Sequence, residues 1–170
     1  MRGRPAVVLV IVLGFVVGPS MAAAGSGAAA SAGSVAQTEE FALAATQPEP
    51  DNTVTRIHLQ ADGSATWELT LRTRLATAAE RSEFEQFQES FRANTSRYLG
   101  PFEERMSGVV AQANETSQRR MAATNFSANT TIQQVPQRWG IVTFRFDWAG
   151  FAAVESDRVV VGDVFDSGFY

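Results

Sequence analysis

The sequence WGIVTFRFDWAG, which occupies residues 139–150, alternates apolar and polar side chains with a period of two. This period predicts a β-strand with one buried face, because successive side chains of a strand point to opposite sides of its sheet. The apolar side consists of Val142, Phe144, Phe146 and Trp148, and the polar side of Thr143, Arg145 and Asp147. A strand with so large an apolar face needs a cover, which the rest of the chain is expected to supply.

A hairpin is predicted before this strand. Residues 53–59 and 65–75 both alternate, and between them lies the sequence ADGS at 61–64. An Asp-Gly pair between two alternating runs is a strong signal for a tight β-turn. One face of the hairpin is expected to hold Ile57, Leu59, Trp67, Leu69 and Leu71, and the wetter face Arg56, His58, Glu68 and Arg72.

Two helices are predicted next. Thr77 and Glu80 have the spacing of a capping box, which starts a helix by satisfying free backbone N–H groups. Gly100-Pro101 is expected to end this helix and to begin a second one, which runs to about Met121. Both carry an apolar stripe, so they are expected to form a helical hairpin that packs on the sheet. The stripes consist of Phe84, Phe87, Phe91 and Tyr98, then Phe102, Met106, Val109, Val110 and Ala113.

After Met121 the period of two returns. Residues 125–132 are predicted to form a strand with one polar face, 135–138 a turn into the strand of residues 139–150, and 153–157 a turn into a last strand at 158–165. The predicted fold class is therefore α+β. A mainly antiparallel sheet, in the order β-β-α-α-β-β-β, packs against the two-helix hairpin.

The N-terminal segment predicts export. Arg2 and Arg4 precede an apolar run at 6–17, and Gly18-Pro19 breaks this run before small residues. Residues 1–24 are interpreted as a secretory signal peptide, with a retained membrane anchor as the alternative. Residues 25–52 are interpreted as a flexible Ala/Gly/Ser/Pro linker and 53–170 as one extracytoplasmic domain. The aromatic residues at the end of the sequence predict that the domain is truncated there. The alternative is a natural terminus whose aromatic side chains pack on the domain.

The composition narrows the classes of function. The chain has no cysteine, which excludes disulfides and thiolate sites, and its 14 basic residues are all arginine within a net charge of −4. Codon bias explains the missing lysine, and so does a high-salt habitat such as that of haloarchaea. The arginines are scattered among acids instead of forming a basic stripe, so no nucleic-acid partner is expected.

The asparagines suggest a modification. Of the five in the chain, all except Asn52 open an N-x-S/T sequence. An exported chain would meet a glycosylation machinery, so these are candidate N-glycosylation sites. In a host that does not glycosylate they would be ordinary polar residues. The four candidates are Asn94, Asn114, Asn125 and Asn129.

No catalytic, cofactor or metal site is predicted. His58 is the single histidine and is interpreted as a strand surface residue, because a metal site normally needs several such ligands. The sequence contains no G-x-S-x-G and no phosphate-binding glycine loop. The glutamates of the first helix are interpreted as surface charge, and Arg119-Arg120 as suited to the end of the second helix, with a lipid or partner site as the alternative.

One surface remains as a candidate for recognition. Arg145 and Asp147 lie on the polar side of the 139–150 strand and are proposed as a partner surface. A cross-strand ion pair is the simpler interpretation of the same two residues.

From Thr53 onward the chain resembles the extracytoplasmic domain of a family of uncharacterised haloarchaeal membrane proteins. The resemblance lies in the hairpin at 61–67, the helical pair that ends at Arg120-Met121, and the stretches 140–151 and 158–165. These are signatures of a fold and not of a catalytic motif. Some members of that family continue to a membrane span and a cytoplasmic helix-turn-helix region and are regarded as regulators. This chain has neither, so the regulatory role is not carried over to it.

The expected function is non-enzymatic. The chain is predicted to be an exported cell-surface domain, the sensing or interaction part of a membrane-anchored protein. Its expected partners are the membrane, through the N-terminal segment or a further C-terminal span, and a protein or a glycan. The alternatives are a secreted hydrolase that uses carboxylates and a structural component of the cell envelope.

Overall fold

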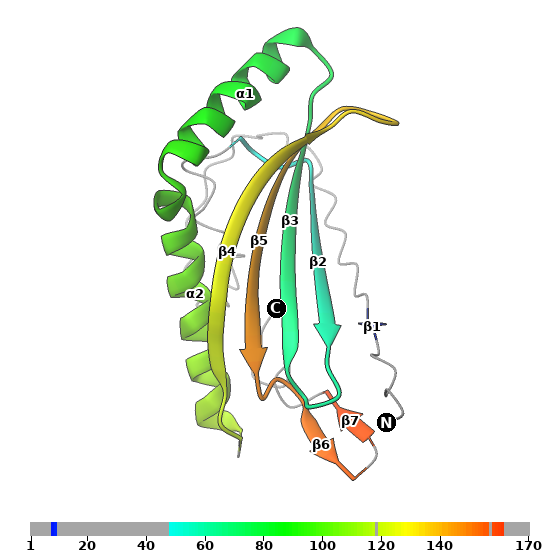
Figure 1. The fold of residues 1–170 in the computed structure, drawn as a ribbon, viewed down its shortest axis with the longest axis vertical. Coiled ribbons are helices and arrows are strands. Elements are labelled where there is room, and N and C mark those ends of the chain that lie inside the picture. Colours follow the sequence, from blue (N-terminus) through cyan, green and yellow to red (C-terminus); the bar gives the residue numbers. More distant parts are fainter. Residues whose placement is uncertain (1–7, 10–47, 118, 157, 162–170) are drawn as a thin grey trace, which may run out of the picture.

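The computed structural model describes residues 8–9, 48–117, 119–156 and 158–161 (Figure 1). Two helices lie against one main sheet, whose strands are ordered β1-β2-β3-β5-β4, and β6 and β7 form a separate two-stranded sheet. The predicted α+β class with an antiparallel sheet is confirmed. The strands are β1 (Val8–Leu9), β2 (Asn52–Leu59), β3 (Ala65–Arg74), β4 (Ala122–Gln133), β5 (Trp139–Ala149), β6 (Ala153–Glu155) and β7 (Arg158–Val160), and the helices are α1 (Ala78–Ala93) and α2 (Thr95–Thr116).

Strand β5 lies in the middle of the sheet, between β3 and β4. It is antiparallel to both, and Phe144 is opposite Leu69 on one side and Ala128 on the other. The predicted alternation is confirmed, because the exposed fractions of Phe144 and Trp148 are 0%. The strand therefore contributes its whole apolar face to the core.

The β2–β3 hairpin is confirmed as predicted. The carboxylate of Asp62 accepts hydrogen bonds from the backbone N–H of Ser64 at 2.9 Å and from its hydroxyl at 2.6 Å. Gly63 has a φ of 81°, a left-handed conformation that glycine adopts without strain. Its carbonyl accepts a 2.8 Å hydrogen bond from the N–H of Ala152, so the turn is attached to the segment that follows β5.

The boundary between the helices differs from the prediction. Helix α1 ends at Ala93, and Asn94 caps α2 by accepting a 3.3 Å hydrogen bond from the N–H of Arg97. Gly100-Pro101 lies inside α2, so the break predicted there was wrong. The helix passes through the proline because the buried side chains of α2 stay on one face only if the helix is unbroken. These side chains are those of Tyr98, Phe102, Met106, Val110 and Ala113.

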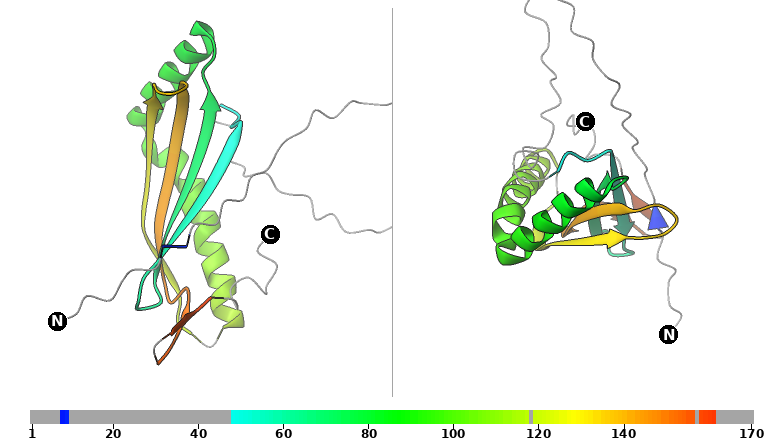
Figure 2. Two further views of the ribbon diagram at one scale, coloured as in Figure 1. Left: turned by 90° about the vertical axis from the view of Figure 1, so that its right-hand side faces the viewer. Right: turned by 90° about the horizontal axis from the view of Figure 1, so that it is seen from above.

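The two helices follow one another along the sheet instead of folding back as a hairpin. Only Asn94 separates α1 from α2, whereas an antiparallel return needs a loop of about two to five residues. In Figure 1, α2 continues from the end of α1 past β4. Both helices lie on the same side of the sheet (Figure 2).

The predicted capping box at the start of α1 is confirmed, with both of its hydrogen bonds present.

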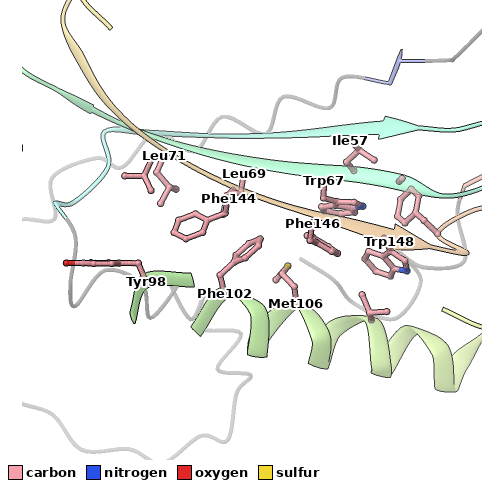
Figure 3. Packing of buried hydrophobic residues seen from close by; sticks show 14 of the residues in the cluster. Ile57, Trp67, Leu69, Leu71, Tyr98, Phe102, Met106, Phe144, Phe146 and Trp148 are labelled. Atoms are coloured by element: carbon pink, nitrogen blue, oxygen red, sulfur yellow. The ribbon is translucent and has the colours of Figure 1, made fainter. Parts of the chain in front are cut away.

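The core lies between this helical layer and the inner face of the sheet (Figure 3). Phe102 of α2 packs on β5, with its ring centroid 4.9 Å from that of Phe144 and 6.0 Å from that of Phe146. The phenylalanines of α1 pack nearer the other end of the sheet. There Phe84 lies against Gly140, and Phe91 stacks on Tyr98 at 4.9 Å.

Strand β4 follows the predicted period from Phe126 to Ile132, with half-buried side chains alternating with exposed ones. A bulge between Thr124 and Ser127 interrupts its pairing with β5. Asn125 lies in this bulge with a φ of 56°. The bulge keeps the two parts of β4 in register with β5 despite the additional residue.

The terminal parts of the chain add two differences. Of the strand predicted at 158–165, β7 covers Arg158–Val160 and pairs with β6 outside the main sheet, and residues 162–165 lie outside the described part of the chain. Val8 and Leu9, within the predicted signal segment, pair with His58 and Ile57 at the edge of β2. The predicted linker up to residue 47 and the aromatic end lie outside the described residues. Among the helices that the structure describes, none is long and apolar enough to cross a membrane.

The two faces of β5 should respond oppositely to an added charge. Phe144→Asp removes a ring that is 0% exposed and buries a carboxylate, so it should cost more than about 4 kcal/mol of unfolding free energy and leave the domain unfolded. Thr143→Asp places the charge on the outer face and should cost about 1 kcal/mol or less. Urea unfolding followed by circular dichroism measures both. Equal damage would mean that the outer face is also buried.

Gly140 and Gly108 form a second matched pair. A Cβ at Gly140 would collide with the ring of Phe84, so Gly140→Ala should destabilise the domain by about 1–3 kcal/mol. Gly108 lies in α2 with open space around the same position, so Gly108→Ala should stabilise it by about 0.5–1 kcal/mol. The midpoints of urea unfolding report both changes. A neutral Gly140→Ala would show that α1 does not press on β5 there.

Candidate functional site

The candidate site is the outer face of the main sheet. Both helices lie on the opposite side, so no described helix covers this face (Figure 2). The strand register brings outward side chains from β2, β3, β5 and β4 into rows across the sheet. The face has a polar composition, with threonines, asparagines, arginines and carboxylates. Its two best-connected rows contain Arg145 and Asp147, the residues predicted as a partner surface.

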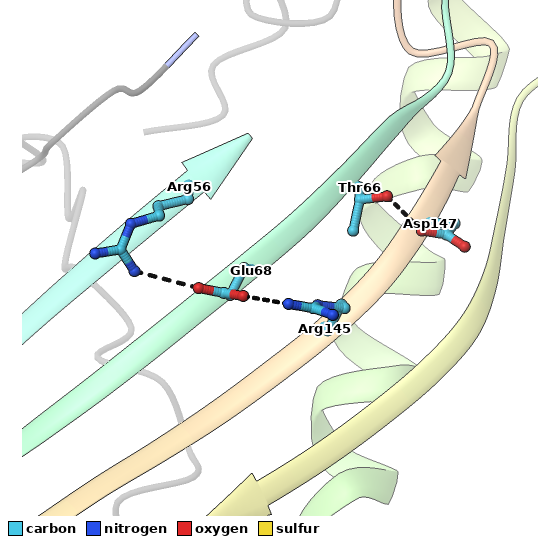
Figure 4. A network of polar contacts seen from close by, with 5 residues as sticks. All are labelled: Arg56, Thr66, Glu68, Arg145 and Asp147. Carbon is cyan, nitrogen blue, oxygen red and sulfur yellow. Dashed lines mark hydrogen bonds and ion pairs between the residues drawn. The ribbon is translucent and has the colours of Figure 1, made fainter. Parts of the chain in front are cut away.

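The first row is an ion-pair network centred on Glu68. Glu68 of β3 is directly opposite Arg56 of β2 and Arg145 of β5. Its two carboxylate oxygens are divided between the guanidinium groups, with Arg56 at 3.2 Å and a short contact to Arg145 (Figure 4). The side chain of Glu68 is 15% exposed, and those of the arginines are 43% and 53% exposed. One half-buried carboxylate therefore connects three strands.

The electrostatics of this row keep Glu68 ionised. The hydrogen bond from Arg145 is the largest effect and holds the pKa of Glu68 below its ordinary value of 4.5. Burial acts in the opposite direction, and Arg56 adds to the lowering. A general acid needs a raised pKa, so this environment favours a structural carboxylate.

The second row is centred on Asp147. Its carboxylate accepts a 2.7 Å hydrogen bond from the hydroxyl of Thr66 and a 2.8 Å hydrogen bond from the side-chain amide of Asn125. Thr66 lies opposite it on β3, and Asn125 reaches it from the β4 bulge. The bulge thus has a local role, because it brings an amide from the edge strand to a carboxylate of the central one.

A third feature lies nearer the end of the sheet where β5 begins. The guanidinium of Arg72 lies over the ring of Trp139, 4.6 Å from its centroid. Thr70, two residues before Arg72, is only 7% exposed although it is on the uncovered face, and its hydroxyl has no partner among the described residues. The central row of the face is thus tightly packed by its own side chains.

The four predicted glycosylation residues are all exposed but lie in different surroundings. Asn94 caps α2, and the side-chain oxygen of Asn114 accepts a 2.9 Å hydrogen bond from the N–H of Met121. The amide nitrogen of Asn125, the atom that a glycan would modify, donates to Asp147. Asn129 lies on the outer face opposite Thr143. Glycosylation remains a prediction at all four, with Asn125 the least suitable.

The remaining candidates have structural positions. His58 is half-buried on β2 opposite Thr66. No group of three or more His, Asp or Glu residues that could hold a metal occurs in the described part of the chain. Arg119 does not serve the end of α2 as predicted. That helix ends at Thr116, and Arg119 donates hydrogen bonds of 3.0 Å to the carbonyls of Gly150 and Phe151.

Arg145 and Asp147 were identified from the sequence, but the side chains that hold them were not. Glu68 was assigned to the wet face of the hairpin, yet its pairing with β5, like that of Thr66, depends on register between strands that are distant in sequence. Asn125 was expected to alternate with its neighbours, and the bulge places it beside Asp147 instead. The sequence did contain a signal for the pairing of Glu68 with Arg145, because Glu68 is the outward acid of β3 and Arg145 is an outward arginine of β5.

The comparisons with known proteins place this chain in a family. The family described as "Domain of unknown function (DUF7345)" matches residues 56–170, which include most of the sheet and both helices. The chain belongs to this family. No curated protein and no solved structure matches it.

The ion-pair row should make stability depend on pH. The pKa of Glu68 is lowered in the folded state, so its contribution is present above the unfolded pKa and is lost as the pH falls through the folded value, below 4.5. Glu68→Gln should cost about 1 kcal/mol at neutral pH, since the arginines are partly solvated, and less at low pH. Urea unfolding at several pH values measures the difference.

The matched control is Glu103→Gln, which changes an exposed carboxylate on α2 and should stay within about 0.5 kcal/mol of the native chain at each pH. A cost for Glu68→Gln that persists unchanged at low pH would contradict the ion-pair origin of the stabilisation.

Proposed function

We propose that this chain is an exported cell-surface domain, the sensing or interaction part of a membrane-anchored protein, and that the outer sheet face is its recognition surface. The observation that carries the proposal is a sheet whose outer face has no described helical cover and whose exposed residues are ordered by cross-strand contacts. A preordered polar surface loses little conformational entropy on binding.

The N-terminal sequence supports the cellular location. Arg2 and Arg4, the apolar run at 6–17 and the small residues that follow have the order of a secretory signal. The absence of cysteine is compatible with an exported domain that is stabilised by packing alone. The resemblance to haloarchaeal extracytoplasmic domains supports the same location, and N-linked glycans at Asn94, Asn114 or Asn129 would be a further consequence of it.

The outer face favours binding over catalysis. Its two described carboxylates, Glu68 and Asp147, are both engaged by neighbouring side chains. Hydrolysis by paired carboxylates would require one of them to be kept protonated, and the arginines act against this at Glu68. A protein or glycan partner would instead meet Arg145, which is exposed at the centre of the face.

Export can be tested with single cysteines, because the native chain has none. Ala149→Cys introduces a thiol at an exposed position at the end of β5, and Ala113→Cys introduces one in the core, where Ala113 is 2% exposed. If the domain is exported, a membrane-impermeant maleimide should label Ala149→Cys on intact cells. Ala113→Cys should react only after denaturation.

Sequencing the N-terminus of the labelled chain then distinguishes cleavage near residue 24 from a retained anchor. Labelling of Ala149→Cys only after cell lysis, together with an intact N-terminus, would refute the proposed export.

A further inference from the structure

The tip of the β4–β5 hairpin is the most exposed apolar point on the described surface. Val135 is 77% exposed, more than any other large apolar residue that the structure describes. Figure 1 shows the tip curving away from the helices, beyond the ends of β2 and β3. Single exposed apolar residues are common on protein surfaces, so the side chains around Val135 decide what the tip can contact.

Cationic and aromatic side chains surround the base of this tip. Trp139 begins β5, Arg74 is directly opposite it on β3, and Arg72 stacks on its ring. Arg138 precedes Trp139, and its guanidinium donates a 2.9 Å hydrogen bond to the side chain of Gln134. From the tip toward the sheet, the apolar Val135 is thus followed by the half-exposed Trp139 and by the arginines around it.

The tip itself contains no acid. Residues 133–139 read QQVPQRW, and two carboxylates lie near Arg74 at the base of the tip. Asp51 accepts a 2.6 Å hydrogen bond from the backbone N–H of Arg74, and Glu80 lies in the first turn of α1, where it accepts a hydrogen bond from the N–H of Thr77. Neither acid belongs to the β4–β5 hairpin, so the tip itself presents only apolar, amide and cationic side chains to a negative surface.

We propose that the β4–β5 tip docks on an anionic membrane surface. Val135 enters the boundary between headgroups and acyl chains, Trp139 lies at the headgroup level, and Arg72, Arg74 and Arg138 face the lipid phosphates. This order matches the polarity profile of a bilayer interface, in which aromatic residues favour the headgroup zone and arginines the phosphate layer. An acidic polypeptide would match the arginines but would leave Val135 without an apolar partner.

The inference rests on the proposed membrane attachment and gives it an orientation. A single valine with a few arginines binds lipid only weakly, so the tip would orient a domain that is already tethered. It would hold the β4–β5 end of the sheet at the membrane and direct the β6–β7 end away from it (Figure 1).

Tryptophan fluorescence provides a selective test with the full chain. Trp67 is 8% exposed and Trp148 0%, whereas Trp139 is half-exposed, so quenching by brominated lipids reports mainly on the tip. Vesicles of brominated phosphatidylglycerol should quench the native chain strongly, and brominated phosphatidylcholine only weakly. Quenching should fall in about 1 M NaCl, where the screening length is about 3 Å.

The matched variants compare two exposed valines at opposite ends of the molecule. Val135→Asp should reduce the affinity for phosphatidylglycerol vesicles about tenfold, because it places a charge where the acyl chains begin. Val154→Asp on β6, at a residue that is 52% exposed, should leave the affinity unchanged. Arg74→Gln should weaken binding, whereas Arg97→Gln, on the exposed side of α2, should not.

Three results would overturn the proposal. The first is that the chain sediments with vesicles but Trp139 is not quenched. The second is that the two valine substitutions have equal effects. The third is that soluble poly-glutamate displaces the vesicles fully, which would indicate an acidic polypeptide as the partner. Because the vesicle experiment uses purified protein, its failure is distinct from a failure of export in cells.

Discussion

The burial of one face of β5 is the constraint on which the rest of the structure depends. Phe144 and Trp148 are fully buried, and they belong to a strand with neighbours on both edges. Strand β3 precedes the helices in sequence and β4 follows them, so the helices connect the two strands that flank β5. The helical layer therefore cannot detach without exposing the aromatic core.

The properties of the outer face follow from this one-sided cover. Every second residue of the central strands is committed to the core, so the others meet solvent and are free to be polar. Cross-strand register then joins them into the Glu68 and Asp147 networks. Each exposed ion pair contributes little by itself, but a half-buried carboxylate shared by two arginines also opposes slippage between the strands.

The sequence predicted local features well and relations between distant segments less well. The alternation of β5, the Asp-Gly turn and the capping box of α1 depend on neighbouring residues, and all three are confirmed. The helix boundary was misplaced because Pro101 is an effective local breaker, whereas the core requires Tyr98 and Phe102 on one continuous stripe. Tertiary packing overrode local propensity at that point.

The candidate site shows the same limit. Arg145 and Asp147 could be identified as outward residues from the period of β5, but their partners depend on pairing with β3 and on a bulge in β4. No periodic rule predicts that an additional residue at Asn125 will turn its amide toward Asp147. The simpler interpretation, a cross-strand ion pair, is correct for Arg145, whereas Asp147 is held by uncharged donors.

These contacts determine where a partner can bind with least competition. At the centre of the outer face, an anionic ligand would have to compete with Glu68 for Arg145, and a cationic one would have to displace Thr66 and Asn125 from Asp147. Near the β4–β5 tip, Arg72 is stacked on Trp139 in a cation–π contact, and none of the ion pairs among the described residues includes it. The centre is therefore suited to a partner of complementary shape with several hydrogen bonds, and the tip to a negatively charged surface.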